Sequence, residues 1–429
     1  AYTEWRATTM AERVSLIREL AARLRAARDD LALLEARDTG NPVTAMAGDI
    51  GVALAQMEYF AGLALEQKGE TVPASGGGLH LTVREPYGVV AKIIAFNHPL
   101  MFAAGKIVPP LLAGNAVVLK PSPVACLSAL EFGRLVADVV PPGLLNILTG
   151  AGSTVGQALV ADPRVRRIAL IGSAETGKAI QRAAADHLAH VTLELGGKNP
   201  MIVFPDADPA QAARAAVAAM NFTRTQAQSC GSSSRLYLHR DVAPKVLEYL
   251  EDEIAKIRMG PTTDSATEMG AIVSRRQYER ILDYIESAKQ EGARLIVGGG
   301  RPQGQAFARG FFIEPTVFVD VQPGMRIARE EVFGPVLSVM EWQDEDEVIR
   351  AANDTDYGLT ANVWTKDLDT ALRVFGRLEA GYLWVNGRGE HFLGLPYGGY
   401  KASGIGREEA LEELLSYSQV KSLSLLRPR

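Results

Sequence analysis

Glu194 and Cys230 stand 36 positions apart near the middle of this chain, each inside a short motif that contains glycine or serine. Glu194 opens the segment Glu-Leu-Gly-Gly-Lys-Asn-Pro, and Cys230 lies in Gln-Ser-Cys-Gly-Ser. Cysteine is the most nucleophilic ordinary side chain, and a carboxylate is a natural base for activating a thiol or a water molecule. The glycines let backbone, substrate and cofactor approach closely. This pairing predicts covalent catalysis on a carbonyl group.

Cys230 has a structural alternative, because a free cysteine is most often a buried core thiol. Its neighbours are small or polar, which favours a nucleophilic role; they include Gln228, Ser229, Gly231 and Ser232. Cys126 lies in a helical, apolar segment and is predicted to be a core residue. The six histidines are scattered and neither cysteine has a CxxC partner, so we predict no metal site.

Two segments are candidates for binding a nucleotide. The turn that contains Gly172, Ser173 and Gly177 leads from a predicted strand into a helix, whose N-terminus can present N–H groups to phosphate. A plain strand-to-helix turn would have a similar sequence. Lys120 and Ser122 follow another buried strand, where a sheet edge would meet a ribose. An isolated lysine in such a place is usually only solvated.

Asn97 ends a predicted strand, in the sequence Phe-Asn-His-Pro. Its side-chain amide is the kind of donor that an oxyanion hole needs. The alternative is a turn-forming asparagine with no catalytic part, since asparagine favours turns. The residues alone leave both interpretations open.

The elements that must position these side chains follow an alternating pattern from residue 88 onward. Short apolar runs occur at 89–95, 116–119, 144–148, 167–171 and 191–195, and again at 201–204, 235–239, 295–297, 336–341, 361–364 and 381–386. Segments of helical composition separate them, for example 242–258 and 275–291. This alternation predicts an α/β fold with parallel sheets, which bind nucleotides at the carboxyl ends of their strands. We expect two such domains, the second of which carries Cys230.

The N-terminal part and two flanking segments have other patterns. Residues 9–37 are predicted to form one long amphipathic helix, which begins with a capping box of Thr9 and Glu12 and ends at 40–42. Residues 69–83 predict an arm or hairpin that leaves the first domain. The acidic run 344–347 is typical of a helix start.

Composition and charge narrow the class of protein. The chain has 429 residues, 47% hydrophobic and 22% charged, as in soluble globular proteins of two or three domains. Its net charge of −5 gives no basic footprint for nucleic acid. No apolar stretch is long enough to span a bilayer, and we expect no signal peptide. With two cysteines we expect no disulfide framework and a cytoplasmic location.

Four sequence blocks in order make the chain resemble the aldehyde dehydrogenase superfamily from about residue 5 to the C-terminus. They are the segments 194–198, 228–235, 330–335 and 396–404. The resemblance implies two Rossmann-like α/β domains with a small β oligomerisation arm. We expect residues 1–67 and 87–195 to bind the nucleotide, 196–400 to form the catalytic domain, and 68–86 with 417–429 to form the arm.

The resemblance also implies roles for individual residues. Cys230 is the nucleophile that forms a thiohemiacetal, Asn97 stabilises its oxyanion, and Glu194 activates the water that hydrolyses the thioester. Lys106 and Glu408 match positions associated with proton relay and with organisation of the site.

For the cofactor, NAD or NADP, the resemblance implies a second set of residues. Lys120 and Ser122 lie at the adenosine ribose, and Gly172, Ser173 and Gly177 at the pyrophosphate. Glu331 holds the nicotinamide ribose, with Phe333 beside it.

Two departures from the family pattern concern the choice between NAD and NADP and the N-terminal boundary of the nucleotide domain. Pro123 stands where many NAD-preferring members have a glutamate that binds the ribose hydroxyls and would repel a 2′-phosphate, so NADP is plausible as well as NAD. The chain also lacks the segment that normally precedes the Trp5 region. We expect either a truncation or an omitted segment at the periphery of the nucleotide domain.

The predicted substrate channel is more polar than is usual in the family. The expected lining residues are His98, Met101, Gly105, His391 and Tyr397. Gly105 would widen the channel and the two imidazoles would favour a bulky or polar aldehyde. The alternative is that the histidines only hydrogen-bond the scaffold.

We therefore predict an NAD(P)-dependent oxidation of a small-molecule aldehyde to a carboxylic acid by hydrolytic deacylation. One alternative is a CoA-acylating semialdehyde dehydrogenase of the same fold, which the presence of Glu194 disfavours. The other is a catalytically inactive scaffold protein. An exposed strand at 417–426 and the arm at 69–86 predict a homodimer or homotetramer, without nucleic-acid or membrane partners.

Overall fold

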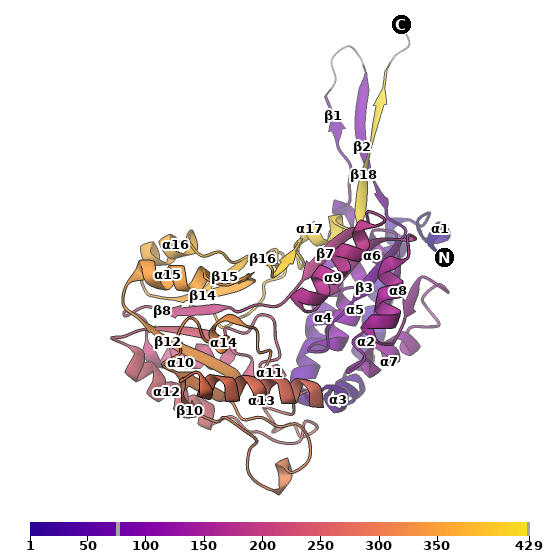
Figure 1. The fold of residues 1–429 in the computed structure, drawn as a ribbon. Helices are drawn as coiled ribbons and strands as arrows, with labels where there is room; N and C mark the ends of the chain where they lie inside the picture. Colours follow the sequence, from indigo (N-terminus) through magenta and orange to yellow (C-terminus); the bar gives the residue numbers. More distant parts are fainter. Residues whose placement is uncertain (74–77, 427–429) are drawn as a thin grey trace.

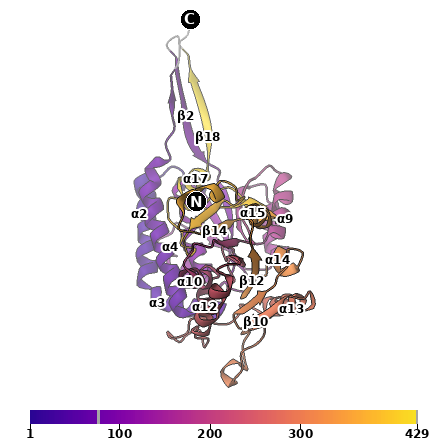
Figure 2. The same cartoon turned by 90° about the vertical axis from the view of Figure 1, so that its left-hand side faces the viewer.

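Two α/β lobes and a projecting β arm make up the molecule (Figure 1). The computed structural model describes residues 1–73 and 78–426. The first lobe contains the N-terminal helices and a six-stranded sheet, and the second contains a seven-stranded sheet. A view turned by 90° shows the arm standing clear of both lobes (Figure 2). The predicted α/β fold is confirmed.

The six-stranded sheet has the order β17-β7-β6-β3-β4-β5. Its strands are β3 (Val89–Ile93), β4 (Ala116–Lys120), β5 (Leu145–Ile147), β6 (Val165–Ile171), β7 (His190–Glu194) and β17 (Gly404–Ile405). β3 to β7 run parallel, and β17 pairs antiparallel with β7. Because the strands are parallel, the residues that end or follow β3, β4, β6 and β7 meet at one edge of the sheet.

Helices cover this sheet. They are α5 (Pro99–Gly105), α6 (Val108–Leu112), α7 (Leu127–Leu135), α8 (Gln157–Ala161) and α9 (Ala174–Ala185), with α1 (Tyr2–Trp5) and α4 (Val43–Leu63) from the N-terminal part. The largest hydrophobic core of the lobe joins α1, α4, α5, α6 and α7 to the sheet, with Ile50, Phe60, Leu111 and Phe132 fully buried. α8 and α9 pack on the sheet through a second core.

The N-terminal segment forms two helices where one was predicted. The capping box of Thr9 and Glu12 is present and begins α2 (Met10–Ala26). Ala27 then leaves the helical region, with φ −99° and ψ 12°, and α3 (Arg28–Thr39) follows. The single long helix was therefore a wrong prediction. Asp29 and Asp30 follow Ala27 and favour a new helix start. The apolar periodicity continues across this break, so periodicity alone did not indicate it.

The seven-stranded sheet has the order β10-β11-β12-β9-β8-β14-β15. Its strands are β8 (Pro200–Val203), β9 (Arg235–His239), β10 (Arg294–Val297), β11 (Thr316–Val319), β12 (Val336–Trp342), β14 (Thr360–Trp364) and β15 (Tyr382–Val385). All pairs are parallel except β10 with β11. The sequence analysis did not predict β11.

The second lobe has helices on both sides of this sheet. They are α10 (Pro209–Ala219), α11 (Phe222–Thr225), α12 (Ala243–Ala255), α13 (Arg275–Gln290), α14 (Arg326–Arg329), α15 (Glu345–Asn353) and α16 (Leu368–Phe375). The acidic run begins α15 as predicted, since the Asp344 side chain accepts a hydrogen bond from the Glu347 backbone N–H. After β13 (Tyr357–Gly358) and β16 (Tyr400–Lys401), the chain returns to the first lobe through β17 and α17 (Leu411–Leu415).

The arm is a three-stranded antiparallel sheet of β1 (Thr71–Val72), β2 (Leu79–Pro86) and β18 (Ser418–Leu425). β18 pairs with β2 from Ser418 opposite Pro86 to Leu425 opposite Leu79. Parts of the predicted arm, 74–77 and 427–429, lie outside the described residues. No helix within the described ranges is long and apolar enough to cross a membrane. The domain boundaries given above remain predictions.

Candidate active site

Two cavities meet at Cys230 and Glu194, because both residues line each of them. Glu194 ends β7 and is buried, while Cys230 is half-buried in the loop between α11 and β9. Asn199 ties the two motifs together, since its Nδ2 donates to the Cys230 carbonyl at 2.7 Å and to the Ser232 carbonyl at 2.9 Å. The amide of one sequence motif thus fixes the loop that carries the thiol of the other.

Burial and neighbouring charge raise the pKa of both reactive groups. Burial raises the pKa of Cys230 well above its ordinary value, and the carboxylates of Glu194 and Glu331 raise it further. Burial also raises the pKa of Glu194, with a second contribution from Glu408. The hydroxyl of Tyr397 lies 4.0 Å from the Cys230 Sγ. A carboxyl group whose pKa moves towards neutrality is suited to general-base work near neutral pH.

Asn97 follows β3 and turns a buried amide into the cavity beside Cys230. The side chain is 3% exposed, and its Oδ1 has no hydrogen-bond partner among the described residues. The backbone carbonyl is held separately, by a 3.0 Å hydrogen bond from the Asn41 amide. Its Nδ2 donates to none of the described residues either, so this donor, in the cavity that Cys230 also lines, is available for a substrate oxyanion.

The larger cavity, of about 440 Å³, lies at the carboxyl ends of β3, β4 and β6. It contains the predicted cofactor residues Lys120, Ser122, Gly172, Ser173, Glu331 and Phe333. The N-terminus of α9 faces it, with Ser173 as the N-cap and Thr176 on the lining. A helix N-terminus, a lysine at a strand end and a buried carboxylate are groups that suit a dinucleotide.

Glu331 is held for this purpose by the glycines of the Glu194 motif. Its Oε1 accepts a hydrogen bond from the Gly197 N–H at 2.9 Å. A Cβ on Gly196 would lie 2.1 Å from the Glu331 Oε2, so only glycine leaves room for the carboxylate. Burial raises the pKa of Glu331 to about 7, although the hydrogen bond from Gly197 opposes the shift.

One predicted cofactor residue lies elsewhere. Gly177 is buried within α9 and does not line the cavity; a Cβ there would lie 2.8 Å from the Leu195 side chain. Its place is therefore the close packing of α9 on the sheet. The sequence analysis predicted the helix at 275–291, but it did not predict that Arg276, Gln277 and Arg280 at the start of α13 line the cavity. The only signal was that a helix begins there, which does not show where it points.

The smaller cavity, of about 190 Å³, leads from Cys230 along the interface of the two lobes. His98, Met101, Lys106, His391, Tyr397 and Glu408 all line it. Gly105 does not. The side chain of Gln56 fills the space instead, since its Oε1 would be 2.0 Å from a Cβ on Gly105. The prediction that this glycine widens the channel is wrong.

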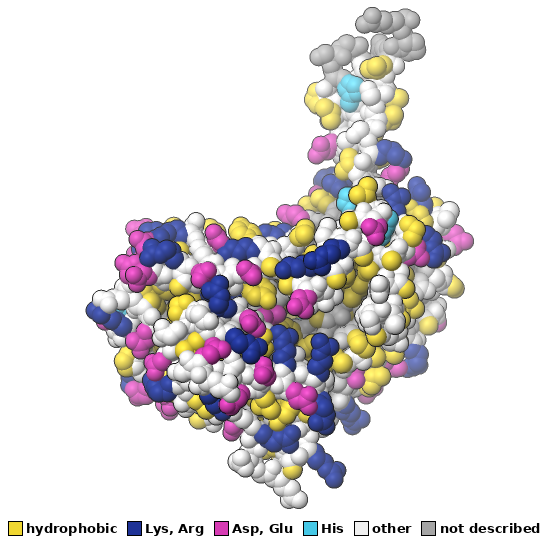
Figure 3. Space-filling model, viewed as in Figure 1, with side chains coloured by type: hydrophobic (Ala, Val, Ile, Leu, Met, Phe, Trp, Pro, Cys, Tyr) yellow, Lys and Arg dark blue, Asp and Glu magenta, His cyan; other side chains and the backbone are white. Residues whose placement is uncertain are grey.

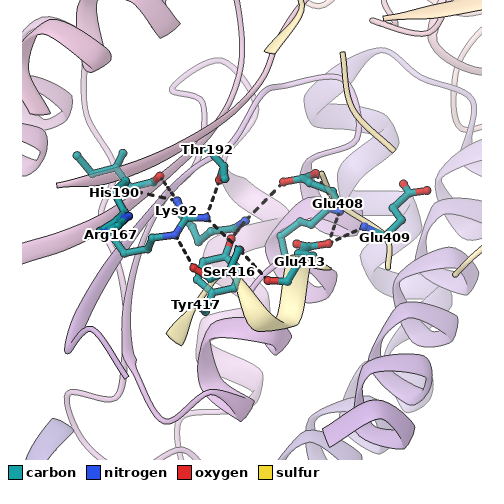
Figure 4. Close-up of polar contacts among 11 residues, drawn as sticks. Lys92, Arg167, His190, Thr192, Glu408, Glu409, Glu413, Ser416 and Tyr417 are labelled. Atoms are coloured by element: carbon teal, nitrogen blue, oxygen red, sulfur yellow. Dashed lines mark hydrogen bonds and ion pairs between the residues drawn. The ribbon is translucent and has the colours of Figure 1, made fainter. Parts of the chain in front are cut away.

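A buried network of charged and polar groups backs the smaller cavity (Figure 4). Lys106 Nζ lies 3.0 Å from Glu408 and 3.4 Å from Glu413. Burial disfavours the ammonium ion, but the two carboxylates outweigh it and raise the pKa of Lys106. Burial likewise opposes ionisation of Glu408, yet Lys106 and Lys92 lower its pKa. Lys92 also donates to the Tyr417 hydroxyl at 2.8 Å, which connects the network to the base of the arm.

Both channel histidines have carboxylate partners that the sequence did not indicate. His98 Nδ1 lies 2.6 Å from Asp49, which is also 2.7 Å from Arg224. His391 Nδ1 lies 3.0 Å from Glu409. These partners are 49 and 18 positions away, so only the tertiary structure brings them together.

Cys126 differs from its predicted place in the core. It is half-buried at the start of α7, between the exposed Val124 and Leu127. Burial still raises the pKa of its thiol. Among the described residues, no group of histidine, cysteine and carboxylate side chains has the arrangement of a metal site.

Comparison with known proteins gives a consistent family. Residues 1–423 match the Aldehyde dehydrogenase family. The chain is 48% identical to the aldehyde dehydrogenase tropH of Talaromyces stipitatus, over 99% of this chain and 84% of that protein. It is 43% identical to a hydroxyisobutyraldehyde dehydrogenase of Mycolicibacterium austroafricanum, over 98% and 83%. The NAD+ complex of an aldehyde dehydrogenase from Bacillus cereus superposes with a TM-score of 0.94 at 39% identity, over 98% of this chain and 85% of that one.

The family match covers almost the whole chain, and the two cavities meet at one cysteine. The chain therefore belongs to the aldehyde dehydrogenase family, as an enzyme that oxidises an aldehyde to the carboxylic acid with NAD or NADP.

Proposed function

We propose that Cys230 is the nucleophile of this oxidation and that Glu194 is the base of its hydrolytic second half. The observation that carries the proposal is that these two side chains are shared by the cofactor cavity and the substrate cavity. A group that attacks the aldehyde has to reach both ligands, and so does a base that later activates water at the same carbon. Cys126 lines neither cavity.

In the first half, the Cys230 sulfur attacks the aldehyde carbon, a C–S bond forms, and the carbonyl electron pair moves to oxygen. The thiol proton leaves to Glu194 or to water. The Asn97 amide and the backbone N–H of Cys230 donate to the oxyanion. NAD or NADP, when bound, supplies the hydride acceptor, and the substrate carbon is left as a thioester on Cys230.

In the second half, Glu194 removes a proton from water while the water oxygen bonds to the thioester carbon. The C–S bond then breaks, its electron pair returns to sulfur, and the carboxylic acid leaves. Glu408 and Lys106, which line the same cavity and are paired at 3.0 Å, are the groups that we propose to relay the proton of Glu194. The carboxylate of Glu194 favours water over CoA as the deacylating group.

Substitution of the two residues tests these roles. Cys230→Ala is expected to abolish oxidation and retain cofactor binding, while Cys126→Ala is expected to keep activity. Glu194→Gln is expected to give a burst of about one reduced cofactor per active site followed by slow turnover, because deacylation has lost its base. Full steady-state turnover in Glu194→Gln, or marked acceleration of the wild type by CoA, would exclude the hydrolytic assignment. The scaffold alternative predicts no reduced cofactor from any aldehyde.

The arm supports a homodimer or homotetramer. β18 is the outer strand of the arm sheet, and apolar side chains are exposed along it (Figure 3). Val420, Leu423 and Leu425 are 57%, 45% and 49% exposed. An unpaired apolar strand edge is normally covered by another chain. Deletion of 418–429 is expected to give monomers or aggregates of low activity; light scattering that finds a fully active monomer would contradict this proposal.

A cytoplasmic location completes the proposal. Both cysteines are free thiols, which suits a reducing compartment.

A further inference from the structure

The substrate cavity has a polar wall that the oxidation chemistry does not use. One face of α4 supplies it, because Asp49, Val52 and Gln56 recur at helical spacing and the last two line the cavity. Asp49 is fully buried behind the wall and holds His98 at 2.6 Å and Arg224 at 2.7 Å. The charge of Asp49 therefore orients two hydrogen-bonding side chains that line the cavity.

Gln56 is the unusual member of this wall. Its side chain is 2% exposed, and its carboxamide makes no hydrogen bond to any other described residue. A buried polar group without a partner is destabilising, so such groups are rare unless a ligand or water pairs with them. The arrangement also needs Gly105, because any side chain there would collide with the Gln56 Oε1. An unpaired carboxamide on the wall of a ligand cavity has capacity to bind a polar group of a ligand.

The charges around the cavity favour a neutral ligand. Arg224 is paired with Asp49, and Lys106 is paired with Glu408 and Glu413, so the cations that line the cavity are already neutralised. Glu390 and Glu409 line it as well. An aldehyde that carries a carboxylate would meet more negative than positive charge there.

The remaining wall and the volume limit the size and shape of the substrate. Trp384, His391 and Tyr397 line the side that belongs to the second lobe, and the rings of His391 and Tyr397 pack 4.3 Å apart. The volume of about 190 Å³ is below the roughly 300–1,000 Å³ of sites for drug-sized ligands. A compact molecule with an apolar face fits this combination.

We infer that Gln56, with His98 and Arg224 oriented by Asp49, binds a hydroxyl group of the substrate, so that the enzyme prefers compact, neutral hydroxyaldehydes to their unsubstituted counterparts. The hydroxyl accepts from the Gln56 Nε2 or from Arg224 and donates to His98 Nε2, because the Gln56 Oε1 is turned towards Gly105 and away from the cavity. This inference rests on the proposed function, in which the aldehyde reaches Cys230 through this cavity. A site built to hydrogen-bond a hydroxyl group discriminates strongly against the analogue that lacks it, because its own polar groups are then left unpaired.

Matched pairs of aldehydes test the inference in the whole enzyme with saturating cofactor. The pairs are benzaldehyde with 3-hydroxybenzaldehyde, and isobutyraldehyde with 3-hydroxyisobutyraldehyde. The expected ratio of kcat/KM, hydroxylated over unsubstituted, is at least about tenfold in one pair or both. A ratio near one in both pairs overturns the inference. Faster oxidation of an aldehyde with a carboxylate, such as succinic semialdehyde, also overturns it.

Variants assign the preference to this wall. Gln56→Leu keeps the bulk and removes the carboxamide, and is expected to bring the ratio close to one. Gln211→Leu makes the same change on the exposed surface of α10 and is expected to keep the wild-type ratio. If Gln56→Leu does not fold, Arg224→Met is expected to lower the ratio in its place. If the folded Gln56 or Arg224 variant keeps the wild-type ratio of kcat/KM, that residue does not bind the substrate hydroxyl.

The ratio of kcat/KM also distinguishes a failure of this inference from a failure of the proposed catalytic roles. It compares two substrates in one enzyme, so an error in the role of Glu194 would change the burst experiment and leave the ratio intact.

Discussion

Glu331 is expected to make cofactor affinity depend on pH near neutrality. Its carboxylate lies in the cofactor cavity and is oriented by the Gly197 N–H. In the proposed site it accepts hydrogen bonds from the ribose hydroxyls of the nicotinamide half. An ionised carboxylate accepts such bonds more strongly than a protonated one, whose O–H competes as a donor. Because burial raises the pKa of Glu331 to about 7, the better acceptor is not fully populated at neutral pH.

The expected size of the effect follows from that pKa. With a pKa of about 7, the ionised fraction of Glu331 rises from about one in eleven at pH 6 to about ten in eleven at pH 8. If only the ionised form binds NAD well, the Kd falls about tenfold over this interval, or about 1.4 kcal/mol. The sign is fixed by the group: affinity increases as the pH rises.

Isothermal titration of NAD at pH 6, 7 and 8 measures this dependence for the wild type and for Glu331→Gln. Glutamine keeps an oxygen that can accept from Gly197 and cannot ionise, so its Kd is expected to be weaker at pH 8 and nearly independent of pH. Glu330→Gln provides a control, since Glu330 is a neighbour whose side chain bonds Tyr284 and does not line the cavity. The reasoning is refuted if Glu331→Gln retains the tenfold dependence, or if the wild-type Kd rises with pH.

Three further predictions follow from groups that are buried in the structure. Asn97→Ala is expected to lower kcat/KM by an amount worth on the order of 3 kcal/mol, the scale of one oxyanion donor, with the Kd of NAD unchanged; a weaker Kd with intact kcat/KM would reassign Asn97 to a structural turn. Glu194→Gln is expected to shift the alkylation of Cys230 by iodoacetamide to lower pH, because it removes a carboxylate that raises the pKa of the thiol; an unchanged alkylation profile would show that Glu194 does not contribute to that pKa. Glu35, whose pKa burial raises to about 8, is expected to make unfolding easier as the pH rises from about 4.5 to 8, because the unfolded chain releases its proton first. In urea unfolding at pH 5 and 8, Glu35→Gln is expected to remove this loss in the free energy of unfolding, which is up to about 1.4 kcal/mol per pH unit. An equal change in the free energy of unfolding between the two pH values in both proteins would exclude this effect of Glu35.

The sequence by itself determined the chemistry and most of the elements that position it. The motifs around Glu194 and Cys230 indicated covalent catalysis on a carbonyl group, and the alternation of apolar runs predicted both α/β lobes. These signals are local: a capping box, a glycine turn and a buried strand are each written within a few residues. For the same reason the strand ends that carry Asn97, Lys120 and Glu194 could be predicted to share one sheet edge.

The tertiary structure decided the environment of those groups and the shape of the substrate cavity. The pKa of Glu331 depends on burial among segments that are far apart in the chain, and the partnership of Asp49 with Arg224 joins residues 175 positions apart. The sequence suggested free space beside Gly105, but Gln56, from the preceding α-helix, fills that space. Periodicity shows which face of a helix is buried; it does not show which side chain from another element will occupy the space opposite, because that depends on how the elements pack.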